Sequence, residues 1–185
     1  TVDLNGVDLG TVSYTHEITP PVENVVTKEN YDGTDSTEVD PNNPVIYADY
    51  RVVINSAGLD LSDTNVVTAT DTLGTNLKLE GSPVISPADG ASFSYDPTTN
   101  VLTFSLKDNT TYTITYKVIV TTIGKNENVS DSDLNTKFGN QIVVDVSGGT
   151  DFSKNVLTAE DYYRSEGDYN HDQKKRIPAG YALFN

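Results

Sequence analysis

The feature that most constrains the fold of this chain is a period of two in short apolar runs. Apolar and polar residues alternate in one segment after another, and Asn, Asp and Gly separate the segments. The clearest runs are residues 45–55, 66–73, 101–106, 111–122 and 140–146. Successive side chains of a strand point to opposite faces, so this pattern predicts strands that bury one face. No segment before residue 155 has a convincing apolar period of 3.6 residues, so we predict an all-β sandwich.

Weaker signals mark the two ends of this pattern. Residues 10–18 and 22–28 are each expected to form a strand, and the Pro20-Pro21 pair between them indicates a linker. Residues 124–139 are predicted to be a polar loop, and Ser147-Gly-Gly marks a boundary after the last clear strand. We therefore predict three parts. Residues 1–21 form an N-terminal strand and linker, 22–146 form the sandwich, and 147–185 are an appended segment or part of a neighbouring domain.

Composition excludes several classes of partner. The formal net charge is −15, so the chain repels nucleic acid and anionic membrane surfaces, and we expect neither as a partner. No apolar run approaches the roughly 18 residues of a membrane-spanning helix, so we expect no membrane insertion. Cysteine is absent, which excludes disulfides and thiolate metal sites.

Known motifs for enzymatic turnover are also lacking. Neither a phosphate-binding glycine loop nor a nucleophile elbow occurs in the sequence, so we predict no enzyme and no cofactor. Residues 168–172 have the Asp-x-Asn-x-Asp spacing that opens a calcium loop. However, Gln173 and Ala179 stand where the loop needs a glycine and a bidentate acid. We therefore expect a polar loop there and no metal site.

Three polar residues fall on apolar strand faces. Lys28 lies two residues after Val26, and residues i and i+2 of a strand share a face. Asp71 shares its face with Val67, Ala69 and Leu73, and Asn140 shares its face with Ile142, Val144 and Val146. Each polar group is costly to bury alone. An alternative for each is a strand-end position with its head group in solvent, and Asp71 could instead cap the turn before Gly74.

Placed together, the three side chains have a chemical solution. Burial favours the neutral forms of the lysine and the aspartate. A neutral amine is a nucleophile, and a protonated carboxyl can polarise the carbonyl of Asn140. Attack at that carbon with loss of ammonia leaves an isopeptide bond between Lys28 and Asn140. A disulfide that closes a loop of similar length contributes roughly 4–5 kcal/mol, and an amide is not reducible.

The order of these residues resembles a known family. The matching segments are Val26-Thr-Lys28, 50–58, 70–73 with 76–79, 111–116, and Asn140 at the start of the last clear strand. Together, over residues 22–146, they resemble the collagen-adhesin-type immunoglobulin-like domains of Gram-positive surface adhesins and pilins. The resemblance implies an immunoglobulin-like β-sandwich, a Lys28–Asn140 isopeptide bond and Asp71 as the assisting acid.

The same resemblance implies a structural stalk or pilin-like domain outside the cell. Its partners would be neighbouring domains of one surface protein, anchored to the cell wall through regions outside this chain. The alternative is an adhesin domain that binds a host matrix protein or a glycan through the loops at 31–44 and 124–139. A carbohydrate-binding module is disfavoured because the chain has no Trp. An ester cross-link through Gln141 is disfavoured because Gln141 lies opposite the apolar face.

Overall fold

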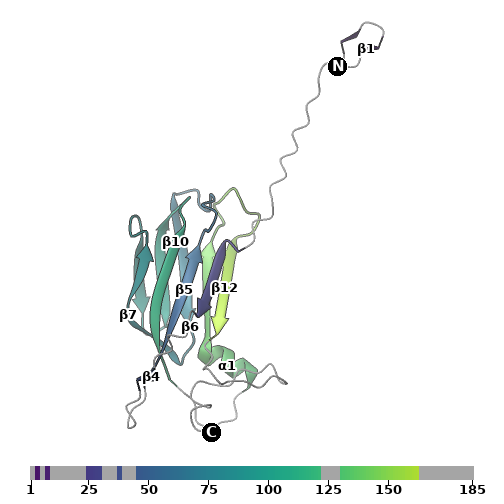
Figure 1. Ribbon diagram of the computed structural model, residues 1–185. Coiled ribbons are helices and arrows are strands. Elements are labelled where there is room, and N and C mark those ends of the chain that lie inside the picture. Colours follow the sequence, from purple (N-terminus) through teal and green to yellow (C-terminus); the bar gives the residue numbers. More distant parts are fainter. Residues whose placement is uncertain are drawn as a thin grey trace.

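The computed structural model shows a β-sandwich made of two antiparallel sheets (Figure 1). It describes residues 3–4, 7–8, 24–30, 37–38, 45–121 and 130–162. The first sheet has the order β3-β5-β10-β7, in which β3 is Val26–Asn30, β5 is Val45–Ile54, β10 is Tyr112–Val120 and β7 is Leu77–Ser86. A short strand, β4 (Thr37–Glu38), pairs with the start of β5.

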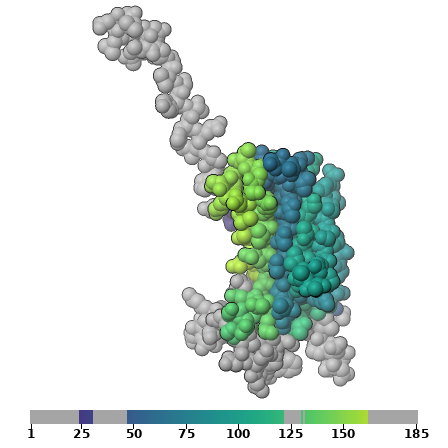
Figure 2. Space-filling view, turned by 180° about the vertical axis from the view of Figure 1, so that it is seen from behind, coloured from purple at the N-terminus to yellow at the C-terminus, as the bar shows by residue number. Residues whose placement is uncertain are grey.

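The second sheet has the order β12-β11-β6-β9-β8. Its strands are β12 (Val156–Tyr162), β11 (Gly139–Asp145), β6 (Val66–Leu73), β9 (Val101–Lys107) and β8 (Ser92–Asp96). Figure 2 shows its outer face, with β11 and β12 in green to yellow, β6 in blue beside them and the β8–β9 hairpin in teal beyond. A separate two-residue pairing joins β1 (Asp3–Leu4) to β2 (Val7–Asp8).

Alternation along the strands builds the core between the sheets. In β10 every second residue from Tyr112 to Val120 is buried, and β6 buries Val67, Ala69, Asp71 and Leu73 in the same way. Aromatic and aliphatic side chains of both sheets fill the space, including Tyr50, Phe104 and Ile142. The predicted all-β sandwich is confirmed, because the two antiparallel sheets each bury one face and pack those faces together.

A short helix occupies part of the segment predicted to be a polar loop. Helix α1 (Asp131–Phe138) begins after Ser130, whose hydroxyl accepts the Asp133 N–H at 3.1 Å and so caps the first turn. Leu134 and Phe138 lie four residues apart on one helix face, and both are buried. The predicted loop over 124–139 was wrong for residues 131–138, because two apolar residues in eight are too few to show a helical period.

A further strand lies beyond the boundary expected after residue 146. Strand β12 pairs with β11 along its whole length, from Gly139 opposite Tyr162 to Asp145 opposite Val156. It runs beside β3 of the other sheet and in the same direction (Figure 1), and the Asn30 N–H donates to the Asp161 carboxylate at 2.5 Å. The second sheet therefore continues past Val146, and β12 covers the edge where the two sheets meet.

Among the described residues, no helix has both the length and the apolar character needed to cross a membrane, and α1 is both short and polar.

Candidate functional site

Strand β3 carries Lys28 into the core. Val26 and Lys28 are the buried residues of this strand, while Thr27 and Glu29, on the opposite face, are exposed. Pairing with β5 sets Lys28 opposite Val52, a fully buried residue. The residue keeps 8% exposure, but its side chain has none, so the ammonium end does not reach solvent.

Asp71 and Asn140 enter the same region from the facing sheet. They lie on neighbouring strands, with Asp71 of β6 opposite Ile142 of β11 and Asn140 of β11 opposite Leu73 of β6. The two are therefore diagonal neighbours on the inner face, a spacing at which side chains can interact. Asp71 is 0% exposed and Asn140 is 2% exposed.

The structure places these predicted side chains in a single buried cluster. Lys28 Nζ lies 2.6 Å from each carboxylate oxygen of Asp71, across the gap between the sheets. The strand-end alternative required the head group of each residue to lie in solvent, but both side chains are fully buried. The carboxylate of Asp71 contacts Lys28 and does not cap the turn before Gly74. The cluster contains an amine, a carboxyl group and a carboxamide, which are the groups that the proposed cross-linking chemistry needs.

Tyr116 of β10 is a member of the cluster that the sequence analysis missed. Its hydroxyl accepts hydrogen bonds from Lys28 Nζ and Asn140 Nδ2, both at 2.7 Å, and donates to Asp71 Oδ2 at 2.9 Å. One signal was available: Tyr116 lies on the inward face of the longest alternating run, and a buried tyrosine hydroxyl needs a partner. That signal gives no partner, because the partners come from three other strands.

Tyr116 is also held by its ring. The Tyr116 ring stacks on the Tyr50 ring with centroids 5.7 Å apart and an interplanar angle of 21°. Lys28 Nζ lies 5.6 Å from the centroid of the Tyr50 ring and 5.3 Å from that of Tyr116. The amine therefore sits among aromatic carbon as well as polar groups, an environment that water does not fill.

Burial changes the acid–base properties of this cluster. Desolvation lowers the pKa of Lys28 from its usual 10.5, although the nearby carboxylates of Asp71 and Asp161 offset part of that effect. Desolvation, together with the charge of Asp71, raises the pKa of Tyr116 well above its usual value. The amine is thus easier to deprotonate than a lysine in water, whereas the phenol keeps its proton.

The carbonyl of Asn140 has no hydrogen-bond partner in the described part of the chain. Its Oδ1 atom is buried and unpaired, while Nδ2 donates to Tyr116. The expected direct contact between Asp71 and this carbonyl is therefore not formed, and the Tyr116 hydroxyl stands between the two residues. A buried unpaired carbonyl oxygen is uncommon in folded proteins and often marks a functional site.

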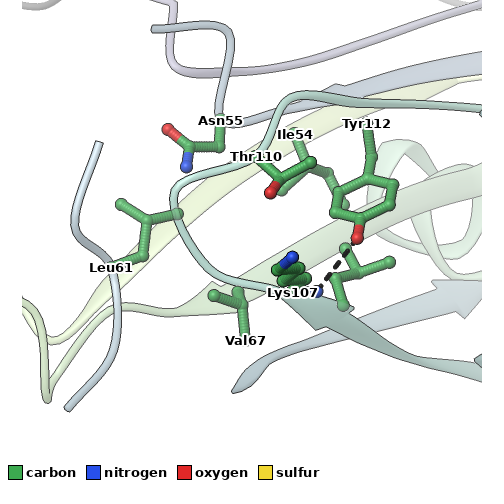
Figure 3. Close-up of a pocket in the computed structure, with 8 residues that line it drawn as sticks. Ile54, Asn55, Leu61, Val67, Lys107, Thr110 and Tyr112 are labelled. Atoms are coloured by element: carbon green, nitrogen blue, oxygen red, sulfur yellow. Dashed lines mark hydrogen bonds between the residues drawn. The ribbon is translucent and has the colours of Figure 1, made fainter. Parts of the chain in front are cut away.

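Other candidate sites on the described residues are weak. No group of three or more His, Cys, Asp and Glu residues there could hold a metal ion. A narrow depression at the end of the core formed by Ile54 and Tyr112 (Figure 3) has no room for even a water molecule, so it is too small for a substrate site. Gln141 is exposed, on the face opposite the cluster.

Some predictions fall on segments that the structure does not describe. The weak strand at 10–18, the calcium-like segment at 168–172 and most of the loop at 31–44 lie outside the described residues. Within the segment 124–139, residues 124–129 also lie outside them.

Comparison with known proteins finds structural likeness only. No protein-family model matches the chain, and no curated protein matches it significantly in sequence. A collagen-binding domain from a Staphylococcus aureus adhesin is similar with a TM-score of 0.49 and 12% identity, covering 75% of this chain and 97% of that domain. A chain from the RrgA Jo.In complex is similar with a TM-score of 0.42 and 14% identity, covering 72% of this chain and 74% of that one. The assignment of a β-sandwich rests on the two sheets described above.

Proposed function

We propose that this chain is a structural domain of a bacterial surface adhesin or pilus, stabilised by a Lys28–Asn140 isopeptide bond that the domain forms by itself. One observation carries the proposal: a fully buried lysine amine contacts a buried carboxyl group and shares a hydroxyl partner with a buried asparagine. A core that served packing alone would be more stable with apolar residues of similar size at these positions. The retained polar cluster therefore favours a chemical role.

The reaction begins with a proton transfer from Lys28 to Asp71. Both carboxylate oxygens lie 2.6 Å from Nζ, and desolvation lowers the pKa of the amine, which eases the loss of its proton. The lone pair of the neutral amine then attacks Cγ of Asn140. The Cγ–Nδ2 bond breaks, and its electron pair leaves with the nitrogen. One proton lost by the attacking Lys28 amine completes the ammonia. Asp71 thus assists by removing the proton that blocks the lone pair.

Ammonia has a short route to solvent. Asn140 lines a surface depression together with Thr72, Gly139, Gln141 and Glu160. Departure of ammonia into this depression makes the reaction irreversible under dilute conditions. The product is a neutral secondary amide, which removes the titratable amine from the core.

The cross-link serves the mechanical role of the domain. It joins β3 of one sheet to β11 of the other and closes a loop of about a hundred residues, for which the entropy model of a disulfide gives roughly 4–5 kcal/mol. A domain closed in this way resists unfolding by a pulling force along its chain. This role fits a stalk that connects neighbouring domains of one surface protein, anchored to the cell wall through regions outside this chain.

Intact mass spectrometry of the purified protein tests the proposal. The mass is expected to be about 17 Da below the value calculated from the sequence, because one ammonia is lost per bond. Lys28→Ala and Asp71→Asn are expected to restore the calculated mass, the first by removing the nucleophile and the second by removing the proton acceptor.

Lys117→Ala is the matched control for this experiment. Lys117 is an exposed lysine next to Tyr116 on β10, and its variant should keep the mass loss. A tandem mass spectrum of the digested protein should also show the peptides of Lys28 and Asn140 joined. An unshifted wild-type mass, or a loss of ammonia that persists in Lys28→Ala, would sink the proposed bond.

A further inference from the structure

The Tyr116 hydroxyl contacts both nitrogens that take part in the proposed cross-linking. It lies 2.7 Å from Lys28 Nζ, the attacking atom, and 2.7 Å from Asn140 Nδ2, the leaving atom. Asp71 contacts Lys28 and Tyr116, but in the described residues its carboxyl group makes no hydrogen bond to Asn140. Tyr116 is therefore the group that connects the two ends of the reaction.

The reaction needs such a connection. When the amine attacks Cγ, the attacking nitrogen becomes positively charged and must lose a proton. The leaving nitrogen must gain one, because an amide anion is far too basic to depart. In water, solvent molecules carry this proton, but the Lys28 side chain is fully buried and Asn140 is 2% exposed. The proton must then pass through a protein group.

We propose that Tyr116 is a catalytic residue that relays this proton from Lys28 to Asn140. The inference rests on the cross-linking proposed above. The phenol proton points to Asp71 Oδ2 in the structure, and it is free to turn toward Nδ2 once Asp71 holds the proton of Lys28. The phenol oxygen then accepts a proton from the attacking nitrogen while its own proton moves to Nδ2, which leaves as ammonia. One N–H bond at Lys28 and the Cγ–Nδ2 bond break, and one N–Cγ bond and one N–H bond of ammonia form. Tyr116 ends as it began, so no other reactant is required.

Two further observations suit Tyr116 to this task. The stacked Tyr50 ring, with centroids 5.7 Å apart, limits the movement of the Tyr116 ring, so the phenol oxygen stays between the two nitrogens. Desolvation raises the pKa of Tyr116, which keeps the proton on the phenol until the leaving nitrogen becomes basic. A hydroxyl that ionised early would hold no proton to give.

The rate of bond formation in the full chain tests the relay. The protein is made in a short pulse of cell-free synthesis, samples are quenched in denaturant at increasing times, and intact mass gives the cross-linked fraction. Tyr116→Phe is expected to slow the loss of ammonia by about 10²–10⁴-fold, the usual contribution of a positioned acid–base group. Tyr112→Phe is the matched control and should react at the wild-type rate.

The control removes a comparable hydroxyl from the same strand. Tyr112 is buried, accepts the Lys107 N–H at 3.1 Å and donates to the Asp89 carbonyl at 3.0 Å, away from the cluster. A second probe replaces Tyr116 by a ring-fluorinated tyrosine, which keeps the hydroxyl but makes it more acidic. A rate that changes with fluorination indicates that the phenol proton moves during the reaction.

Each outcome separates the relay from the bond itself. If the wild-type protein loses no ammonia, the proposed cross-link fails. If the wild-type protein cross-links and Tyr116→Phe does so equally fast, the relay is overturned while the cross-link stands. If Tyr116→Phe does not fold, the fluorinated protein decides, and an unchanged rate there overturns the relay.

Discussion

Lys28 is the residue whose burial is hardest to reconcile with a purely structural core. An ion removed from water costs several kcal/mol even after the protein relaxes around it. The cluster offsets this with two carboxylate contacts and one hydroxyl contact to Nζ, and desolvation still lowers the pKa of the amine. Conversion of the amine into an amide removes that residual cost, which is a physical reason for the cross-link to stabilise the fold.

The lowered pKa of Lys28 predicts a pH dependence in a variant that cannot cross-link. In Asn140→Ala the amine remains free, and its pKa in the folded state lies below the 10.5 of the unfolded chain. Between these two values the unfolded state binds more protons, so the free energy of unfolding should rise with pH across that window. Urea denaturation at several pH values measures the slope.

The matching reference is the double variant Asn140→Ala/Lys28→Met, which lacks the titrating amine. Its free energy of unfolding contains the same general charge effects, so subtracting it from that of Asn140→Ala isolates the contribution of Lys28. If this contribution falls as pH rises, a lowered pKa for the buried amine is contradicted.

At the scale of elements, backbone hydrogen bonds hold the end of α1 against the residues that directly follow β6. Three backbone hydrogen bonds join residues 74–76 to α1 and the start of β11: Gly74 N to Gly139 O at 2.7 Å, Thr75 N to Thr136 O at 3.0 Å and Asn76 N to Lys137 O at 2.9 Å. This joint sets the position from which β11 begins, one residue before Asn140. The position of the reacting carboxamide therefore depends on a close backbone approach at Gly74.

Gly74→Ala should disturb that joint. A Cβ at residue 74 would collide with the backbone carbonyl of Lys137 and lie 2.9 Å from the carbonyl oxygen of Gly139. Backbone atoms cannot move aside as a flexible side chain can, so we expect a loss of about 1–3 kcal/mol and slower cross-linking. Thermal denaturation and the time course of the mass loss measure the two effects.

Thr75→Ala provides the comparison at the neighbouring exposed position, where the backbone hydrogen bond to Thr136 is kept. It should match the wild-type protein in both measurements. If Gly74→Ala also matches the wild type, the start of β11 is not set by this approach.

At the scale of the whole molecule, the cross-link divides the sandwich into two mechanical parts. The loop from Lys28 to Asn140 contains β4 to β10 and α1, whereas most of β11 and all of β12 lie outside it. Force that enters at β3 passes through the bond to Asn140 and then into the β11–β12 hairpin. The hairpin is therefore the part that can unfold while the enclosed strands stay folded.

Single-molecule stretching between cysteines introduced at residues 24 and 162 tests this division, since the chain has no cysteine of its own. The cross-linked protein should lengthen by less than about 100 Å, whereas Lys28→Ala should lengthen by about 400–500 Å, from roughly 3.5 Å per extended residue. A full-length extension of a protein whose mass shows the cross-link would contradict the proposed bond position.

Much of the fold was predictable from the sequence because strand periodicity is local. The strand at 66–73 is observed with the predicted bounds, and the run at 101–106 forms β9, which extends one residue further to Lys107. The helix α1 and the strand β12 were not predicted. The apolar face of α1 consists of only two residues. Strand β12 is stabilised by its pairing with β11, and the residues of β12 alone do not show that pairing.

By itself, the sequence determined which side chains turn inward. Lys28, Asp71 and Asn140 each share a face with buried apolar neighbours, and a period of two is enough to show this. Only the tertiary structure decided that the three meet, that β12 lies beside β3, and that the Tyr116 hydroxyl connects the amine to the carboxamide. The physical reason is that alternation sets the face of a strand, whereas contacts across a sandwich depend on strand order and register, which long-range pairing determines.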